Sequence, residues 1–194
     1  GALAGITNSL YQVRDYAISA TWSDYDNDGD LDLFTPIYNK SNPNSAGNVL
    51  YRNDGKGNFT NVSRESGLNE RLDARGCAWA DFDNDGDLDV FVANGDLYGN
   101  GFGPNQKSCL YRNNGNGTFT KIVVGALVTD VGVSMSGAWG DYDNDGLVDM
   151  FVVDGKGNNR LYHNDGDGAF SRVTSGSLAN DGGQSQACAW GDYD

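Results

Sequence analysis

One nine-residue motif recurs along the chain and constrains its fold more than any other feature. Copies begin at residues 24, 81, 141 and 192, and the last is cut short because the sequence ends at residue 194. Each copy follows a tryptophan, and each of the first three precedes an apolar run. The tryptophans are Trp22, Trp79, Trp139 and Trp190. Intervals of 57, 60 and 51 residues between copies predict a repeat protein in which each repeat is one structural unit.

The motif is rich in carboxylates at alternate positions. Aspartate stands at positions 1, 3, 5 and 9 of each complete copy, and glycine at position 6. This spacing lets a tight loop turn successive oxygens inward, while glycine takes a positive backbone angle. Calcium requires six to eight hard oxygen ligands, so each copy predicts a calcium (Ca²⁺) site. The predicted ligands are Asp24, Asp26, Asp28, Asp30, Asp32, Asp81, Asp83, Asp85, Asp87, Asp89, Asp141, Asp143, Asp145, Leu147, Asp149, Asp192 and Asp194.

Position 7 is expected to bind through its backbone carbonyl, because the third copy has Leu147 there. Magnesium fits the motif less well, since it retains waters and rarely fills a cage made only of protein oxygens. Ordinary turns also collect aspartate and glycine, but three copies in register argue against that alternative. A helix-flanked calcium loop would need glutamate at position 12, where this chain has Thr35, Val92 and Val152.

A second motif recurs in phase with the first, at residues 50–60, 110–120 and 161–171. Its Asn-Asp-Gly or Asn-Asn-Gly segment is typical of a β-hairpin turn. Each repeat therefore divides into four short strands, which in the second repeat are expected at about 75–81, 88–94, 108–113 and 118–124. No sustained apolar stripe of helical period is present, so little helix is expected. We predict an all-β fold of β-propeller blades, each with four antiparallel strands.

The repeat boundaries follow from the motif phase. Residues 17–74, 75–133 and 134–184 are expected to form three full blades, 1–16 the tail of a preceding blade, and 185–194 the first strand of a fourth. A four-stranded sheet cannot bury both faces alone, so blades stack face to face. The tryptophans are expected to pack between blades rather than to form a ligand platform. Small residues two positions before them fit a crowded inner strand: Ala20, Cys77, Gly137 and Cys188.

These repeats resemble the FG-GAP or VCBS family, the calcium-binding blades of integrin α-subunit propellers and of many large bacterial surface proteins. The resemblance rests on the Asp-x-Asp-x-Asp-Gly-x-x-Asp pattern of the three complete motifs and covers the chain from about residue 17 onward. It implies a propeller of six to eight blades, usually seven, that serves in adhesion, carbohydrate binding or scaffolding. Three blades and one extra strand fall short of that number. We therefore expect either a fragment of a longer protein or an assembly of several copies.

Charge and composition narrow the function further. The net charge is −14, and sixteen of the 27 acidic residues lie in the four loops. Nucleic-acid binding is not expected, because no basic face exists to meet phosphate. The sequence has no apolar run long enough to span a membrane, and loops of this kind suit millimolar calcium, so an extracellular or cell-surface location is expected. Cys77, Cys109 and Cys188 are interpreted as small packing residues rather than a disulfide framework.

Catalysis is not expected. His163, the only histidine, occupies a repeat position held elsewhere by Arg52 and Arg112, so it is interpreted as a repeat variant. The two glutamates, Glu65 and Glu70, are expected to be solvated. A secreted enzyme that acts on polysaccharides remains the weaker alternative, because paired carboxylates can hydrolyse glycosides.

Binding is the favoured function. In a four-stranded blade the connections at residues 38–47 and 95–107 lie opposite the calcium loops, and loops on a rigid scaffold often carry recognition. Tyr38, Tyr98 and Phe102 are candidates to stack on sugar rings, or alternatively to anchor these loops. Two classes remain open. One is an adhesion or lectin-like module that binds a glycan or an extracellular protein, and the other is a structural subunit that self-associates through open blade edges.

Overall fold

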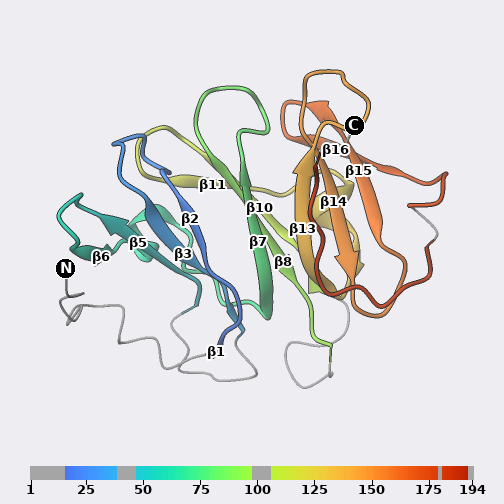
Figure 1. Ribbon diagram of the computed structural model, residues 1–194, viewed down its shortest axis with the longest axis horizontal. Coiled ribbons are helices and arrows are strands. Elements are labelled where there is room, and N and C mark those ends of the chain that lie inside the picture. Colours follow the sequence, from blue (N-terminus) through green and yellow to red (C-terminus); the bar gives the residue numbers. More distant parts are fainter. Residues whose placement is uncertain (1–15, 39–46, 98–105, 179–180, 192–194) are drawn as a thin grey trace.

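Three four-stranded antiparallel sheets form the body of the protein (Figure 1). The computed structural model describes residues 16–38, 47–97, 106–178 and 181–191. Blade 1 contains β2 (Thr21–Ser23), β3 (Asp32–Thr35), β5 (Val49–Asn53) and β6 (Phe59–Asn61). Blade 2 contains β7 (Ala74–Ala80), β8 (Asp89–Asn94), β10 (Cys109–Asn113) and β11 (Phe119–Ile122). Blade 3 contains β13 (Ser134–Gly140), β14 (Asp149–Asp154), β15 (Arg160–Gly166) and β16 (Ala169–Val173).

The order of strands in each sheet follows the order in the chain, as expected for propeller blades. The four strands predicted for the second repeat are confirmed to within one or two residues at each end. Helix is limited in the described part of the chain to two single turns, α1 (Ser63–Ser66) and α2 (Ala126–Thr129). The prediction of an all-β fold of propeller blades is therefore confirmed.

Two small sheets at the end of the blades opposite the aspartate loops were not anticipated from the sequence. One pairs β1 (Tyr16–Ala17) with β4 (Ile37–Tyr38), and the other pairs β9 (Gln106–Lys107) with β12 (Val131–Gly132). Each pair joins connections that are far apart in sequence. Sequence patterns of alternating polarity cannot identify strands of two residues, because such strands are too short to show a period.

The two largest core clusters lie between the blades rather than within any one sheet. One cluster joins blade 1 residues Phe34 and Leu50 to blade 2 residues Val90 and Val92. A second joins Phe91 and Leu110 of blade 2 to Met150, Val152 and Tyr162 of blade 3. Both sheet faces of blade 2 are thus covered, which a single four-stranded sheet could not achieve.

The tryptophan at the end of the first strand packs against the preceding blade. Trp139 stacks on Phe82 of blade 2 with ring centroids 6.3 Å apart, and its indole N–H donates to the Ala78 carbonyl oxygen at 3.1 Å. Trp79 packs edge-on against Phe34 of blade 1 at 5.8 Å. The predicted packing role is confirmed for these two. Trp22, at the same repeat position, is 56% exposed.

The small residues before the tryptophans are crowded where a preceding blade is present. A Cβ atom on Gly137 would lie 2.8 Å from both Met150 Sδ and Phe91 Cε1, so a larger residue there would require these side chains to shift. Cys77 is buried at the corresponding position in blade 2. All three cysteines are free, in agreement with their interpretation as packing residues.

Residues 181–191 differ from the expected first strand of a fourth blade, because no strand is assigned within them. In the three described blades that strand pairs with one that follows the aspartate loop, and the sequence ends inside the fourth loop. The segment nevertheless follows the repeat pattern in its contacts. Cys188 packs against a cluster that contains Met135 and Val153, and Trp190 covers Gly140.

Trp139→Ala should lower the free energy of unfolding by about 2–4 kcal/mol, because it removes a large side chain from the contact between two blades. Trp22→Ala is the matched control, and its cost should stay below about 1 kcal/mol because that ring is mostly in solvent. Urea denaturation of both variants measures the difference. Equal losses would contradict the assignment of this position to the inter-blade contact.

Candidate functional site

The aspartate loops connect the first and second strands of each blade. Antiparallel order places them at the same end of the sheets as the hairpins between the third and fourth strands. This arrangement brings the two sequence motifs together, although their first residues are 20 or more positions apart in the chain. Residues from two segments of the same blade, the aspartate loop and the hairpin, therefore line each candidate site.

All three loops have the same backbone conformation. The position 1 carboxylate of Asp24 accepts hydrogen bonds from the N–H groups of Asp28 and Gly29, both at 3.0 Å. Equivalent bonds to the position 1 aspartate recur in the second and third loops at 2.9–3.1 Å. The glycine at position 6 has φ of 91–93° in every copy, as the sequence predicted.

Asparagine at position 4 has a role that sequence reasoning missed. Asn27, Asn84 and Asn144 all have positive φ, between 56° and 61°, which asparagine tolerates better than most residues. The side chains of the first two also connect neighbouring loops. Asn27 Nδ2 donates to Asp87 Oδ1 at 2.8 Å, and Asn84 Nδ2 donates to the Gly146 carbonyl oxygen at 3.2 Å.

The position 9 aspartate lies at the base of each loop, where it is fully or almost fully buried: Asp32, Asp89 and Asp149. In blade 2, Asp89 Oδ2 accepts the Phe82 N–H at 3.0 Å and Oδ1 accepts the Asn113 N–H at 2.8 Å. The same pair of bonds recurs in blades 1 and 3. One carboxylate thus joins the start of the aspartate loop to the end of the third strand.

Burial also changes the acidity of these groups. Desolvation raises the pKa of Asp32 to about 6 and that of Asp89 to about 7, and nearby aspartates add to both shifts. Burial and the neighbouring aspartates likewise raise the pKa of Asp26 and Asp83 at position 3. The raised pKa values thus reflect burial and the crowding of carboxylates at this end of each blade.

Carboxylate oxygens converge in each loop. Three groups have ligand atoms within 4.8 Å of one another: Asp24, Asp26 and Asp32; Asp81, Asp83 and Asp85; and Asp141, Asp143 and Asp145. Asp26 Oδ1 and Asp83 Oδ1 are buried atoms with no hydrogen-bond donor. A buried carboxylate oxygen without a donor is costly unless a cation compensates it. The residues present therefore fit a hard divalent cation, with Asp26 and Asp83 as central ligands.

Position 7 differs from the other acidic positions. The Asp30 side chain turns toward the hairpin of its blade, so that a Cβ atom on Gly55 would lie 2.3 Å from Asp30 Oδ2. Asp87 is placed similarly against Gly115. These side-chain directions agree with the prediction that position 7 binds calcium only through its backbone carbonyl. That ligand role stays a prediction. Asp192 and Asp194 of the fourth motif lie outside the described residues.

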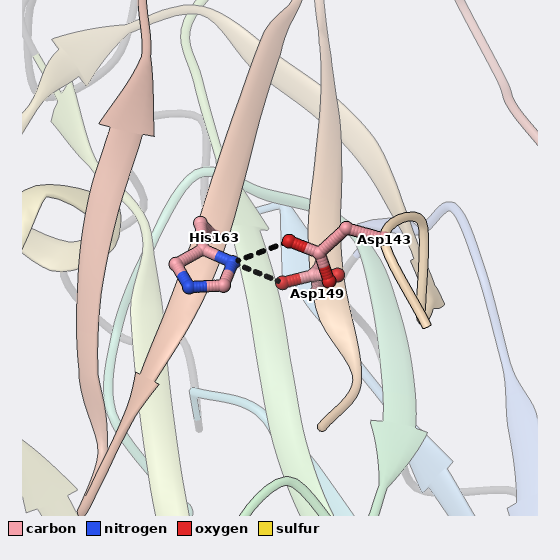
Figure 2. A group of neighbouring side chains, drawn as sticks. All are labelled: Asp143, Asp149 and His163. Carbon is pink, nitrogen blue, oxygen red and sulfur yellow. Dashed lines mark ion pairs between the residues drawn. The ribbon is translucent and has the colours of Figure 1, made fainter. Parts of the chain in front are cut away.

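A basic position on the third strand faces the aspartate loop, and the sequence analysis missed this. Arg112 Nε lies 2.7 Å from Asp83 Oδ2 in blade 2. In blade 3 the same position is His163, whose Nδ1 lies 3.2 Å from Asp143 Oδ2 and 3.4 Å from Asp149 Oδ1 (Figure 2). The recurrence of Arg, Arg and His in the hairpin motif is the signal that could have indicated this.

Two expectations for the opposite end need correction. Tyr38 is not exposed: it is 6% accessible, and the Arg75 guanidinium lies 4.0 Å from its ring centroid. Its pairing in β4 fixes it as a loop anchor. Glu70 is not simply solvated, because it forms an ion pair with Lys121 at 2.6 Å and accepts the Tyr111 hydroxyl. Tyr98 and Phe102 lie outside the described residues.

Repeated four-stranded blades with an acidic loop at the same turn define a β-propeller-type repeat protein. The FG-GAP-like repeat matches residues 24–92, 95–152 and 141–194, which leaves only 1–23 and 93–94 unmatched. The chain therefore belongs to the FG-GAP-like repeat family, as the sequence motifs indicated. A comparison with curated proteins found no match. Among the described residues, no helix has the length and apolar character needed to cross a membrane.

In the presence of a chelator, the protein should become more stable as the pH falls from about 7.5 to about 5.5. Asp32 and Asp89 have raised pKa values in the folded state, so the folded chain binds more protons than the unfolded chain in this range. Their unfavourable contribution is absent below about pH 4, where both states are protonated, grows as the pH rises from there, and is complete above about 6 to 7. Thermal unfolding across the pH series measures the effect.

Asp89→Asn is the control, and it should flatten this profile because it removes the group with the higher pKa. A metal-free stability that rises with pH between about 5.5 and 7.5 would contradict the assignment of these buried carboxylates.

Proposed function

We propose that each complete aspartate loop binds one calcium ion, and that the chain is an extracellular, non-catalytic propeller module that binds a glycan or a protein. The observation that carries the proposal is the convergence of carboxylates around the buried, donor-free oxygens of Asp26 and Asp83. Calcium takes carboxylate and carbonyl oxygens in flexible geometry, and these loops offer both.

Charge supports calcium as the occupant. Each loop gathers at least four carboxylates, and the chain carries a net charge of −14. Without cations these groups repel one another and weaken the compact state. Extracellular modules bind calcium with dissociation constants of about 10⁻⁴–10⁻³ M, so loops of this kind would fill in millimolar calcium outside the cell.

The binding surface is proposed at the end opposite the calcium loops. The second strand of each blade ends there and the third begins there, on a scaffold fixed by inter-blade packing, and residues 38–47 and 95–107 connect these strands in blades 1 and 2. Rigid scaffolds commonly present recognition loops in this way. Tyr98 and Phe102 stay the candidate contacts for a sugar ring, whereas the burial of Tyr38 removes it from that set.

Calcium should raise the unfolding free energy by about 1.4 kcal/mol for each site when its concentration is ten times the dissociation constant. Asp26→Asn should abolish the contribution of the first loop, because Asp26 supplies the buried, donor-free oxygen. Asp30→Asn is the matched control in the same loop, and it should retain binding because position 7 is expected to use its carbonyl. Isothermal titration and thermal unfolding with calcium test both.

Three outcomes would count against the calcium proposal. They are no calcium binding by the wild-type chain, an equal response to magnesium, or equal losses in the two variants. The recognition proposal has its own test, which is binding to arrays of glycans and extracellular proteins in millimolar calcium. Retained binding by a Tyr98→Ala, Phe102→Ala double variant would show that these rings are not the contacts.

A second candidate, a self-associating structural subunit, is favoured by one observation. Ile18, Trp22 and Leu31 of blade 1 are 50–56% exposed, whereas the counterparts of Trp22 in blades 2 and 3 pack on a preceding blade. A second copy could cover this surface as one blade covers another. Exposed apolar surface of this kind often marks an interface.

If copies associate through blade 1, sedimentation velocity should show concentration-dependent oligomers, and Trp22→Glu should return the protein to monomers. Leu178→Glu is the control, because Leu178 is also exposed but lies after blade 3. A monomeric wild-type chain at all concentrations would leave the binding module as the better candidate.

A further inference from the structure

The third loop differs chemically from the first two. Its facing basic residue is His163, which is the only histidine in the chain, instead of Arg52 or Arg112. Its position 7 residue is Leu147, so it also has one aspartate fewer than the other loops. An arginine cannot give up its proton to bind a metal, whereas a neutral imidazole is the commonest metal ligand among side chains.

The distances in this loop are those of ligands around one small cation. His163 Nδ1 is 3.2 Å from Asp143 Oδ2 and 3.4 Å from Asp149 Oδ1, and the three side chains converge in Figure 2. Consider two donor atoms that each lie about 2.1 Å from one zinc ion. If the donor–zinc–donor angle lies between the right angle of a square arrangement and the tetrahedral angle, the two donors are about 3.0–3.4 Å apart. The group as a whole fits within 4.8 Å.

The inner nitrogen of His163 is in ion-pair contact with the loop, as Arg112 Nε is in blade 2, and neither nitrogen makes a hydrogen bond. His163 Nδ1 is a buried atom and makes no hydrogen bond to either carboxylate, although both oxygens are near. The rest of the ring reaches the surface, since the side chain is 30% exposed. The inner nitrogen therefore faces the carboxylates, and an ion from solvent has a short path to it.

Two carboxylates lie near the outer nitrogen, both beyond hydrogen-bond distance. His163 Nε2 lies 4.0 Å from Asp145 Oδ2 and 3.9 Å from Asp165 Oδ1. Metal-ligating histidines usually direct their second ring N–H to a carboxylate or carbonyl, which orients the ring. In blade 2, by contrast, Arg112 Nε sits 2.7 Å from Asp83 Oδ2 and adds a fixed positive charge.

We infer that the third loop, besides the calcium proposed for it above, also accepts a divalent transition metal such as zinc, with His163 Nδ1, Asp143 and Asp149 as ligands. Mixed imidazole and carboxylate donors suit zinc and its neighbours, whereas loops with only oxygen donors suit calcium. The inference rests on the proposed function in one respect, which is that the third loop binds a cation. It does not depend on calcium in the other two loops.

The test uses the chain without an affinity tag, with zinc as the ligand and cobalt (Co²⁺) as the spectroscopic probe. The wild-type chain should bind one equivalent of zinc and give cobalt absorption bands that zinc abolishes. His163→Arg, which restores the residue type of the other blades, should weaken zinc binding at least about tenfold. Because His163 is the only histidine, imidazole NMR signals report this site alone.

Arg112→His is the complementary variant, because it places the same donor in blade 2. A second equivalent of zinc in this variant would support the inference. If no second equivalent of zinc binds, the claim that the residue facing the loop determines which metal the loop binds would be overturned. Unchanged zinc affinity in His163→Arg, or three equal zinc sites in the wild-type chain, would overturn the site itself.

Calcium titration of His163→Arg separates this inference from the proposed function. Retained calcium binding together with lost zinc binding supports both. A wild-type chain that binds zinc at His163 but binds no calcium would refute the calcium proposal and leave the third site standing. Calcium binding without a shift of the His163 signals on zinc addition would refute only the inference.

Discussion

A buried carboxylate at the base of each aspartate loop holds the blade together at that end. Asp89, for example, accepts one N–H from its own loop and one from the end of the third strand. The asparagine that donates its N–H to this carboxylate also bonds to the preceding blade through its side chain. Asn113 Nδ2 donates to the Tyr25 carbonyl oxygen at 2.7 Å, and Asn164 Nδ2 donates to the Phe82 carbonyl oxygen at 2.8 Å. Loop conformation, strand register and blade stacking therefore depend on the same few polar contacts, which are buried and strengthened by the low local dielectric.

This coupling explains why the candidate cation sites and the stability of the fold are linked. The carboxylates that build the loop are also those that burial and mutual repulsion make costly, as the raised pKa values of Asp32 and Asp89 indicate. A cation placed among them would offset that cost without any new packing. Under the proposed function, the ion stiffens one end of the scaffold while recognition takes place at the other.

Repetition also allows the blades to differ in chemistry while they share one fold. The basic position on the third strand faces the aspartate loop in blades 2 and 3, yet Arg112 brings a fixed charge there and His163 a potential metal ligand. Neither side chain is a member of the inter-blade core clusters, although the Arg112 guanidinium lies 5.5 Å from the Phe82 ring centroid. If the third loop binds zinc as proposed, the metal preference of a blade depends on one residue outside the aspartate motif.

Features that depend on neighbouring residues were determined by the sequence alone. The motif spacing predicted the blades, the strands of the second repeat and the positive φ of Gly86, because turn chemistry and strand period act over a few residues. Only the tertiary structure decided which distant groups meet. It buried Tyr38 beneath Arg75 and placed His163 next to Asp143. It also made Asp89, a predicted metal ligand, the hydrogen-bond acceptor for the end of the third strand. These contacts arise from sheet pairing and blade stacking across long stretches of chain, and no local pattern records them.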